Sequence, residues 1–592
     1  MAYHAPTRDM SFILNDVLGL QELGFPDLGR DLVDAVLEEG GKLASEVLAP
    51  LNGPGDREGC RLESDGVRTA RGFAQAYRQW VEGGWASLAA TPDFGGQGLP
   101  LSVAVAAQEM WNAANISFGL CPLLSQGAVE ALTTHGSQAL KDRYLAKLIS
   151  GEWTGTMNLT EPQAGSDLNA LKAKAIPLGE GRYAITGTKI FITYGDHDMA
   201  ENIVHLVLAR LPDAPAGTRG ISLFLVPKFL VNADGSLGER NDAHCIGIEE
   251  KLGIHASPTC VMSYGEKGGA TGWLIGEENR GLACMFTMMN NARLLVGTQG
   301  VALADRATQH ALAYARDRKQ GRAAGTSAPA GEMSPIIEHA DIRRTLMTMK
   351  ALTQAARMIC YATGVALDQA HIATSAETRE SGKTRADLLT PIAKSFSTDI
   401  AVEVASMGVQ IHGGMGYIEE TGAAQFLRDA RILPIYEGAN GIQAIDLVTR
   451  KLPLGNGAVV SDLMEEIAQT ARDAAARGEA FLAMGEELAN ACKTLEDANV
   501  YMAEQLKSTP QNALAGASPY LRLFGTVLGA HFLIRAALVA TSAAHPAAFA
   551  KTRLVTAQFY ADNILPAASG LAHSACAGAE TLYALDATAL AS

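Results

Sequence analysis

The chain has 592 residues, of which 48% are hydrophobic and 19% are charged. This composition fits a globular protein of roughly two to four domains and excludes a disordered chain. A formal net charge of -15 argues against nucleic acid as a partner, because phosphate binding requires concentrated positive charge. The cysteines form no CxxC pair and the histidines show no metal-ligand spacing. We therefore expect free thiols, a reducing compartment and no metal site.

The N-terminal MAYHAPTRDM lacks the charged and then apolar profile of a signal peptide. The long apolar stretch Leu521–Ala544 contains Arg522, His531 and Arg535, and the 12 residues between the arginines are too few to cross a bilayer. We expect this stretch to be a buried helix. The prediction is a cytoplasmic protein without a membrane span.

Residues 1–152 are expected to form an N-terminal helical domain. Helical spacing of apolar residues predicts helices over Asp31–Leu48, Phe73–Glu82, Val103–Asn112 and Gly127–Leu148. The Gly- and Pro-rich segment TPDFGGQGLP, residues 91–100, is predicted to be a loop between two of them.

The character of the chain changes at Trp153, where short β-branched segments separated by Gly, Pro, Asp or Asn begin. They predict strands over residues 154–160, 183–193, 202–211, 220–230, 259–265 and 271–276. Residues 153–280 are therefore expected to form a middle domain, a small antiparallel barrel or sandwich.

Helical periodicity returns after residue 280 and continues to the C-terminus. We expect a helical domain over residues 281–452, with polar loops at Gly321–Ser334 and Ala376–Arg385. The Pro- and Gly-containing LPLGNG, residues 452–457, separates it from an additional helical domain over residues 458–592. The predicted fold class is α+β, with the layout α, β, α and a further α domain.

Glu437, in the segment RILPIYEGANGIQ, is the strongest candidate for catalysis. Apolar Ile432, Leu433 and Ile435 precede it, and a carboxylate held against apolar surface is poorly hydrated, so its basicity rises. That property suits a base that removes a weakly acidic proton near neutral pH. The alternative is an ordinary acid at a helix start, because residues 441–451 have helical spacing.

Two segments of the middle domain could line a cofactor. MNLTEPQAGSD offers backbone N–H groups around residues 164–166 and the hydroxyls of Thr160 and Ser166, which could cradle phosphate or flavin edges. KIFITYG is a predicted strand with Phe191 and Thr193 on one face, where an aromatic ring could stack on a flat cofactor. The alternatives are a plain turn after a strand and an ordinary half-buried strand.

Two later segments could bind a pyrophosphate. RDRKQGR closes a predicted helix with cations, so Arg318 could pair with phosphate or could form an ordinary solvated helix end. In QIHGGMGY, Gly413 and Gly414 would let phosphate approach the backbone closely. The segment is not GxGxxG after a strand, so a Rossmann site is not indicated.

Taken in order, these segments resemble the acyl-CoA dehydrogenase flavoproteins. TEPQAGSD, KIFITYG, RKQGR, QIHGGMGY and IYEGANGIQ are similar to the family motifs TEPxAGSD, W/F-I-T, RKxFG, QxxGGxGY and IYEGTxxIQ, over roughly residues 30–450. The resemblance implies FAD as cofactor and a fold of α-helical, β-barrel and four-helix domains.

The resemblance also implies the reaction. Glu437 would remove the α-proton of an acyl-CoA thioester while a β-hydride passes to flavin N5, giving a trans-2-enoyl-CoA. The thioester carbonyl would accept a hydrogen bond from the backbone N–H of Glu437. Some members carry the base one residue before the arginine of the sequence MNNARLLVG; here that position is Ala292, followed by Arg293.

The remaining roles are carried over residue by residue. Substrate contacts are expected from Ser166, Asn290, Arg293 and Gly438. Flavin contacts are expected from Met157, Thr160, Ser166, Phe191, Thr193, Arg318, Gln320, Gln410, Gly413, Gly414, Ala439 and Gly441, with those of Arg318, Gln320, Gln410, Gly413 and Gly414 reaching a neighbouring subunit's cofactor. Met157 replaces a frequent aromatic residue and Ala439 replaces a frequent Thr.

The N-terminal YHAPTRDMSFILNDVL, the segment KLGIHASPTC and the extra helical block resemble one branch of the family, which contains 3-methylmercaptopropionyl-CoA dehydrogenases. The branch implies a homodimer and an electron-transfer flavoprotein as electron acceptor. Three alternatives remain: a long-chain acyl-CoA dehydrogenase, an acyl-CoA oxidase that uses oxygen, and a DNA-associated stress protein, which the net charge of -15 disfavours.

Overall fold

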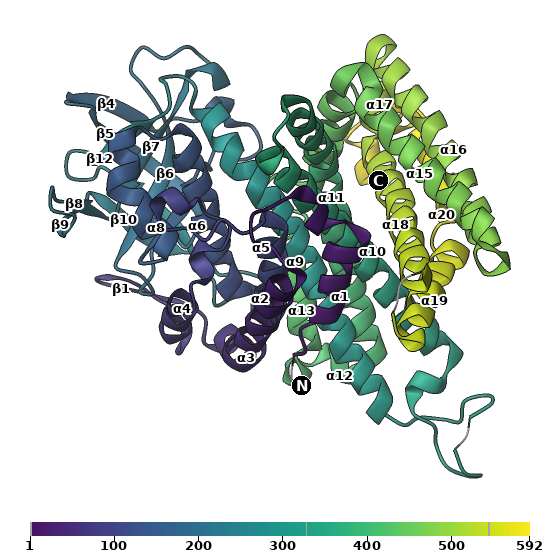
Figure 1. Ribbon diagram of the computed structural model, residues 1–592. Coiled ribbons are helices and arrows are strands. Elements are labelled where there is room, and N and C mark those ends of the chain that lie inside the picture. Colours follow the sequence, from purple (N-terminus) through teal and green to yellow (C-terminus); the bar gives the residue numbers. More distant parts are fainter. Residues whose placement is uncertain (1–2, 327, 543–544) are drawn as a thin grey trace.

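The computed structural model describes residues 3–326, 328–542 and 545–592, and it places a β-rich region at one end of a large helical body (Figure 1). The N-terminal helices lie between the strands and the long central helices, and the last helices cover the far side of the central ones (Figure 1). The predicted α+β class and its α, β, α, α order are confirmed.

The N-terminal region contains α1 (Thr7–Ser11), α2 (Arg30–Leu43), α3 (Ala49–Glu58), α4 (Phe73–Glu82), α5 (Leu101–Ala114), α6 (Ile116–His135), α7 (Gln138–Leu140) and α8 (Ala146–Ser150), and the short strands β1 (Arg61–Glu63) and β2 (Gly66–Arg68). The predicted helix Gly127–Leu148 is wrong as a single element. Helix α6 ends at His135, and Ser137 starts the next turn by accepting a hydrogen bond from the N–H of Leu140 at 3.4 Å.

The middle region contains β3 (Trp153–Asn158), β4 (Lys174–Gly179), β5 (Arg182–Thr193), β6 (Asn202–Arg210), β7 (Ile221–Pro227), β8 (Phe229–Val231), β9 (Leu237–Arg240), β10 (Ala243–Ile248), β11 (Thr259–Tyr264) and β12 (Ala270–Ile275). Strand β5 pairs with β12, β12 with β7, β7 with β6, β6 with β4 and β4 with β5, so these strands close into a barrel.

The predicted barrel is therefore correct in its closure, but three details differ. Strand β3 runs parallel to β6, so the barrel is not purely antiparallel. The predicted strand 220–230 is interrupted at Lys228, whose N–H donates to the carbonyl of Ile203. Strands β4, β9 and β10 were not predicted, because each is short and carries polar, Gly or Pro residues that weaken the alternating pattern.

The central helices are α9 (Gly281–Asp317), α10 (Ala340–Ile372) and α11 (Ala376–His412), followed by α12 (Gly414–Tyr417), α13 (Ala423–Ala430) and α14 (Asn440–Asp446). Helices α9 and α11 approach closely, because a Cβ atom on Gly300 would lie 2.5 Å from the carbonyl oxygen of Ser397. The predicted loop Ala376–Arg385 is wrong: it is the start of α11, capped by the Ser375 hydroxyl, which accepts from the N–H of Thr378 at 3.0 Å.

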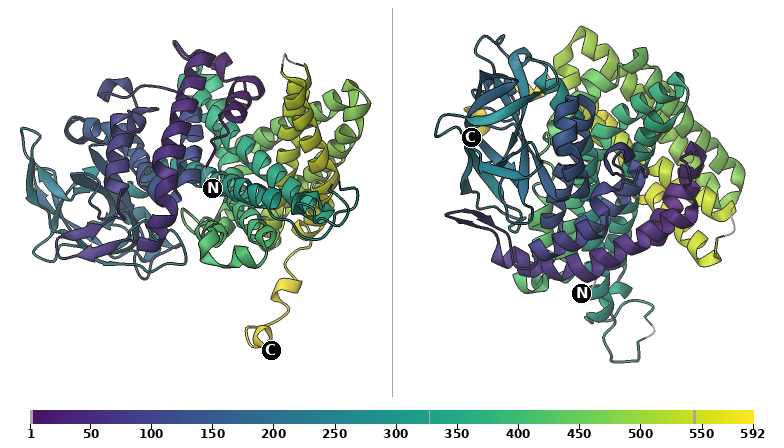
Figure 2. Two further views of the ribbon diagram at one scale, coloured as in Figure 1. Left: turned by 90° about the horizontal axis from the view of Figure 1, so that it is seen from below. Right: turned by 60° about the vertical axis from the view of Figure 1, so that its left-hand side comes forward.

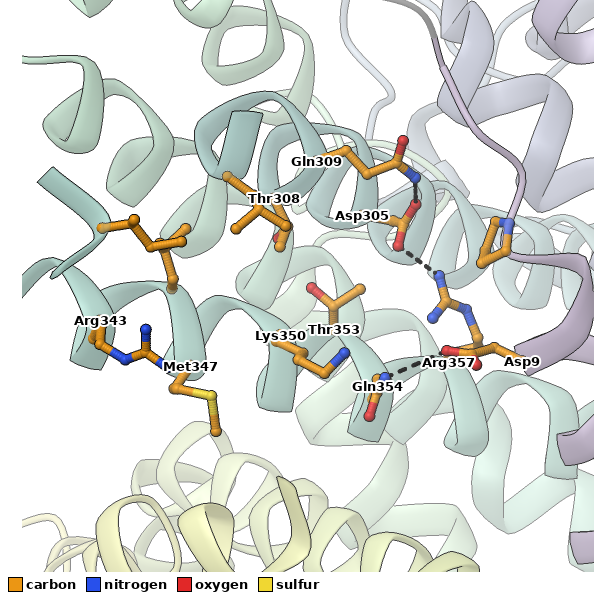
Figure 3. A pocket seen from close by; sticks show the side chains of 14 residues that line it. Asp9, Asp305, Thr308, Gln309, Arg343, Met347, Lys350, Thr353, Gln354 and Arg357 are labelled. Atoms are coloured by element: carbon orange, nitrogen blue, oxygen red, sulfur yellow. Dashed lines mark hydrogen bonds and ion pairs between the residues drawn. The ribbon is translucent and has the colours of Figure 1, made fainter. Parts of the chain in front are cut away.

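A buried ion cluster joins α5, α9 and α10. The Arg357 guanidinium donates to Glu109 at 2.7 Å and to Asp305 at 3.0 Å, and the Tyr361 hydroxyl also donates to Glu109. Beside the cluster, α1, α9 and α10 enclose a cavity of about 340 Å³, in which Lys350 and Gln354 lie near Arg357 (Figure 3). Glu437 is not among the residues that line this cavity.

The C-terminal region contains α15 (Ala458–Arg477), α16 (Glu479–Ser508), α17 (Pro510–Ala515), α18 (Ala517–Ser542), α19 (Ala547–Asn563) and α20 (Ala567–Ala575). Helix α18 packs on α10 and α11, and its Arg522 forms an ion pair with Glu403 of α11 at 2.7 Å. In the part of the chain that the structure describes, α18 is the one helix long and apolar enough to cross a membrane, but 83% of that window is buried inside the protein. The prediction of a buried core helix is therefore correct.

Two segments project from this body. The segment between α9 and α10, which begins at Arg318, extends away from the central helices (Figure 1). The chain after α20 also leaves the body and ends in an extended tail (Figure 2). The first of these carries the predicted phosphate-binding residues Arg318 and Gln320.

Candidate active site

Glu437 lies in the tight loop between α13 and α14. The loop is closed by a hydrogen bond from the N–H of Asn440 to the carbonyl of Pro434 at 2.9 Å. Glu437 has a φ of +55° and Gly438 a φ of +87°, so two consecutive residues take the left-handed conformation. For a residue with a Cβ atom this conformation costs about 1–3 kcal/mol, and it persists only where the surroundings enforce it.

Burial raises the pKa of Glu437 to about 7, and the positive charges of Arg293 and Lys394 oppose part of this rise. The raised basicity predicted from the sequence is present, but its source differs. Leu433 is buried, whereas Ile435 is 53% exposed and does not shield the carboxyl group. The two opposing cations come from α9 and α11, helices that are distant from the loop in sequence.

Arg293 of α9 lies against the loop. Its guanidinium is 7% exposed, donates to Asn290 Oδ1 at 3.3 Å and approaches Asp446 Oδ2 at 4.0 Å. A Cβ atom on Gly438 would lie 3.7 Å from its Nη2 atom. The structure thus brings Arg293, Asn290 and Gly438 together beside Glu437. Ala292 is buried on the same helix and offers no carboxylate.

Tyr436, immediately before Glu437, begins a chain of buried polar side chains. Its hydroxyl donates to Gln299 Oε1, Gln299 Nε2 donates to Asn112 Oδ1 at 2.9 Å, and Asn112 Nδ2 donates to the Gln108 carbonyl at 2.8 Å. Gln108 Nε2 then donates to Gln126 of α6 at 3.0 Å. This polar chain connects the loop that carries Glu437 with α5 and α6.

The candidate flavin residues of the middle region gather at the end of β5. Phe191 is 60% exposed with a φ of +58°, at an irregularity in the pairing of β5 with β11. Thr193 is half-buried on the same face, and Met157 is buried on β3. The N–H of Ile190 donates to the carbonyl of Thr160 at 2.9 Å, which places the loop after β3 beside Phe191. Ser166 is exposed on that loop.

A buried ion pair anchors this loop. Lys189 Nζ lies 2.9 Å from Glu161 Oε1, and both side chains are at most 4% exposed. Burial tends to raise the pKa of Glu161, but Lys189 and the N–H groups of Lys172 and Ala173 outweigh it and hold that pKa below its usual value. The loop conformation is therefore stabilised from the strand that carries Phe191.

The candidate dinucleotide residues lie on exposed backbone. Arg318 and Gln320 are exposed in the projecting segment, and Gln410, Gly413 and Gly414 are exposed at the end of α11. A Cβ atom on Gly413, Gly414 or Gly441 would meet nothing within 4 Å. Ala439, the residue before α14, is half-buried.

These residues fit a flavin dinucleotide. An exposed aromatic ring, open glycine backbone and an exposed guanidinium are the groups that hold a flat ring and a pyrophosphate. Among the described residues, the hydroxyls of Thr160, Ser166 and Thr193 form no hydrogen bond with the protein, so they are available to a ligand.

Sequence comparison identifies the family. Family models match residues 57–152, 156–264 and 279–452 as the N-terminal, middle and C-terminal domains of acyl-CoA dehydrogenase, and residues 463–586 as acetyl-CoA dehydrogenase C-terminal like. The chain belongs to the acyl-CoA dehydrogenase family. Members of this family are FAD-dependent oxidoreductases, and the predicted enzyme class and cofactor are confirmed.

Individual relatives agree with this result. The chain is 48% identical over 574 residues to a 3-methylmercaptopropionyl-CoA dehydrogenase from Ruegeria pomeroyi, covering 95% of this chain and 96% of the relative. It is 35% identical to a butyryl-CoA dehydrogenase from Syntrophomonas wolfei, covering 95% of each chain.

Solved structures share the fold. ACDH-11 from Caenorhabditis elegans, in complex with C11-CoA, superposes with a TM-score of 0.78 at 21% identity over 95% of this chain and 92% of that one. An acyl-CoA dehydrogenase complexed with FAD from Bacillus anthracis superposes with a TM-score of 0.73 at 21% identity, over 95% and 91% of the two chains.

Three residues of the site region were missed from the sequence: Glu161, Lys394 and Asn440. A weak signal existed for Lys394, because it is a lone cation in the otherwise uncharged segment TPIAKSFST. Its significance depends on Asn440 and Glu437, which only the packing of α11 against the loop brings close.

Proposed function

We propose that Glu437 is the base that removes the α-proton of an acyl-CoA thioester. The observation that carries this proposal is its pKa of about 7 in a loop forced into a left-handed conformation. A carboxylate with that pKa is substantially ionised at neutral pH and is far more basic than an ordinary glutamate. FAD, when bound, supplies the acceptor for the β-hydride.

The backbone of the same loop supports the polarisation of the thioester. Within residues 3–326, 328–542 and 545–592, the N–H of Glu437 donates no hydrogen bond to the protein. A free N–H beside the base can donate to the thioester carbonyl oxygen and stabilise the negative charge that develops there. Arg293 and Gly438, which adjoin the loop, are the proposed substrate contacts, together with Asn290 and Ser166.

The proposed flavin contacts are those whose exposure and position fit the cofactor. Phe191 and Thr193 would meet the ring system, and Met157, Thr160 and Ser166 would border it. The proposed contacts to the dinucleotide are Arg318, Gln320, Gln410, Gly413 and Gly414. Ala439 and Gly441 are proposed flavin contacts near the catalytic loop. The segment between α9 and α10, which begins at Arg318, projects from the body (Figure 1), and this supports a homodimer in which the segment reaches the partner's cofactor.

We propose 3-methylmercaptopropionyl-CoA, or a related short- or medium-chain thioester, as substrate. The support is the 48% identity to a dehydrogenase of that name. We further propose that the polar chain from Tyr436 to Gln126, which starts at the residue before Glu437, borders the acyl chain and favours a short thioether over a long alkyl chain. We also propose domain boundaries at residues 152, 280 and 452–458, a cytoplasmic location, and an electron-transfer flavoprotein as the electron acceptor.

The central test is anaerobic mixing of the enzyme with acyl-CoA while the flavin absorbance is followed. The wild-type flavin is expected to bleach. The Glu437→Gln variant, which keeps the shape of the side chain, is expected to bind FAD normally and to lose at least about 10³-fold in the reduction rate, a loss typical of removing a general base. Near-normal bleaching by this variant would place the base elsewhere.

A further inference from the structure

Lys394 is a fully buried lysine in the middle of α11, with no exposed surface. Its Nζ atom donates one hydrogen bond among the described residues, to Asn440 Oδ1 at 2.8 Å. An ammonium group has three donors, and a single neutral acceptor does not compensate for burying its charge. The cost of this burial has to be offset by another group.

Asn440 is the first residue of α14 and stands three residues after Glu437. Its amide donates to Asp399 Oδ1 at 2.7 Å and to Thr398 Oγ1 at 3.0 Å, both on α11. Its own N–H closes the catalytic loop on Pro434. Asn440 therefore ties the loop, through Pro434, to the helix that carries Lys394.

The charge of Lys394 acts on Glu437. Burial lowers the pKa of Lys394, and the nearby carboxylates of Glu437 and Asp399 oppose this change while Arg293 adds to it. The positive charge of Lys394 in turn lowers the pKa of Glu437. The groups that face this site are Arg293 of α9, Lys394 and Asp399 of α11, Tyr436 of the loop and, through Arg293, Asp446 of α14.

We propose that Lys394 is a positioning residue for the dehydrogenation: it fixes the catalytic loop through Asn440 and supplies a buried positive charge that keeps Glu437 ionised in the resting enzyme. This inference rests on the proposed role of Glu437. Without the cation, a carboxylate buried in this loop would hold its proton at neutral pH and could not act as a base.

Three substitutions separate the two proposed roles of Lys394, its hydrogen bond to Asn440 and its positive charge. Lys394→Gln removes the charge and keeps an N–H donor for Asn440. Lys394→Met removes both and leaves an unbranched apolar side chain in a buried place, which protein interiors tolerate. Lys394→Arg keeps the charge. Lys350→Met is the matched control, because burial also lowers the pKa of Lys350, which lines the separate cavity of α9 and α10.

The measurement is the rate of anaerobic flavin reduction by acyl-CoA as a function of pH, on enzyme whose FAD content and thermal unfolding match the wild type. Loss of a cation near the base should move the midpoint of the profile alkaline by about one pH unit in the Gln and Met variants. The rate of the Gln variant should recover at high pH, whereas that of the Met variant should stay lower because its loop is released. Lys394→Arg and Lys350→Met should keep the wild-type midpoint.

Midpoints within about 0.2 pH unit of wild type in both the Gln and Met variants would overturn the inference, as would an equal shift in the Arg variant. If the uncharged variants lose FAD or fold poorly, Lys394→Arg still tests the inference, because a midpoint that shifts by about one pH unit although the charge is retained would overturn it. Failure of the Glu437 assignment is distinguishable, because then Glu437→Gln itself would still reduce the flavin.

Discussion

Gln443 of α14 donates from Nε2 to the carbonyl oxygen of Gly438 at 3.2 Å, and this contact ties the loop that carries Glu437 to α14. A Cβ atom on Gly438 would lie 2.7 Å from that Nε2 atom. Glycine is therefore required at position 438 for two reasons, the φ of +87° and the lack of space for a side chain.

Gly438→Ala is expected to slow flavin reduction at least about tenfold. The added Cβ atom would strain the left-handed backbone by about 1–3 kcal/mol, and the loop would relax and shift the carboxyl group of Glu437. The measurement is single-turnover reduction at saturating acyl-CoA. Gly570→Ala, at an exposed position of α20 where a Cβ atom meets nothing within 4 Å, is the control and should have no effect. An unchanged rate in Gly438→Ala would contradict the proposed geometry.

The wild-type reduction rate is expected to rise with pH to a plateau, with a midpoint near 7, because the pKa of Glu437 is raised to about 7 and only its ionised form accepts a proton. Well below the midpoint the rate should fall about tenfold per pH unit. Stopped-flow reduction between about pH 5.5 and about pH 9 tests this. A flat profile over that range would mean that the base ionises at an ordinary glutamate pKa.

Removing the cation of the buried ion cluster should lower the free energy of unfolding of the central helices. Arg357→Met leaves Glu109 and Asp305 without their cation, and burial already raises the pKa of Glu109 although Arg357 opposes it. We expect a loss of about 3–5 kcal/mol in the free energy of unfolding. Arg472→Ala, in an exposed pair with Glu465, should change it by less than about 1 kcal/mol. Urea unfolding compares the two variants.

The Lys189–Glu161 pair should matter for cofactor retention. Lys189→Met removes the cation and leaves Glu161 held by the N–H groups of Lys172 and Ala173 and by the Gln163 amide, so the loop that carries Thr160 and Ser166 should loosen. FAD affinity is expected to fall about tenfold or more, by analogy with the loss of one charged partner. Equilibrium dialysis of FAD measures it. An unchanged affinity in a folded variant would remove this loop from the flavin site.

The substrate proposal predicts a preference. Among 3-methylmercaptopropionyl-, butyryl-, octanoyl- and palmitoyl-CoA, kcat/KM should be highest for the first. Gln299→Leu interrupts the polar chain at Tyr436. The ratio of kcat/KM for octanoyl-CoA to kcat/KM for 3-methylmercaptopropionyl-CoA should then rise by about 10-fold, which lies within the range by which binding sites discriminate between polar and apolar groups. A wild-type maximum at palmitoyl-CoA would make the long-chain alternative correct. Peroxide formation during turnover would favour the oxidase.

Much of the fold followed from local patterns. Helix α4 has the predicted bounds Phe73–Glu82, and the long central helices and the strands β5, β6, β11 and β12 lie where their periods placed them, because apolar spacing and turn residues are properties of neighbouring positions. The incorrect predictions also arose from local patterns. The start of α11 reads as a polar loop because its first turns face solvent, and α6 ends at a Gly-Ser pair that the apolar pattern overrides.

The sequence by itself determined the candidate base, the flavin-shaped motifs and the α, β, α, α order, because each depends on residue type and spacing. Tertiary structure alone decided what makes Glu437 basic. Burial raises its pKa, and the cations Arg293 and Lys394, which lie on helices far away in the chain, oppose part of that rise. Electrostatic energy depends on distances and burial in three dimensions, and these arise only when α9, α11 and the catalytic loop pack together.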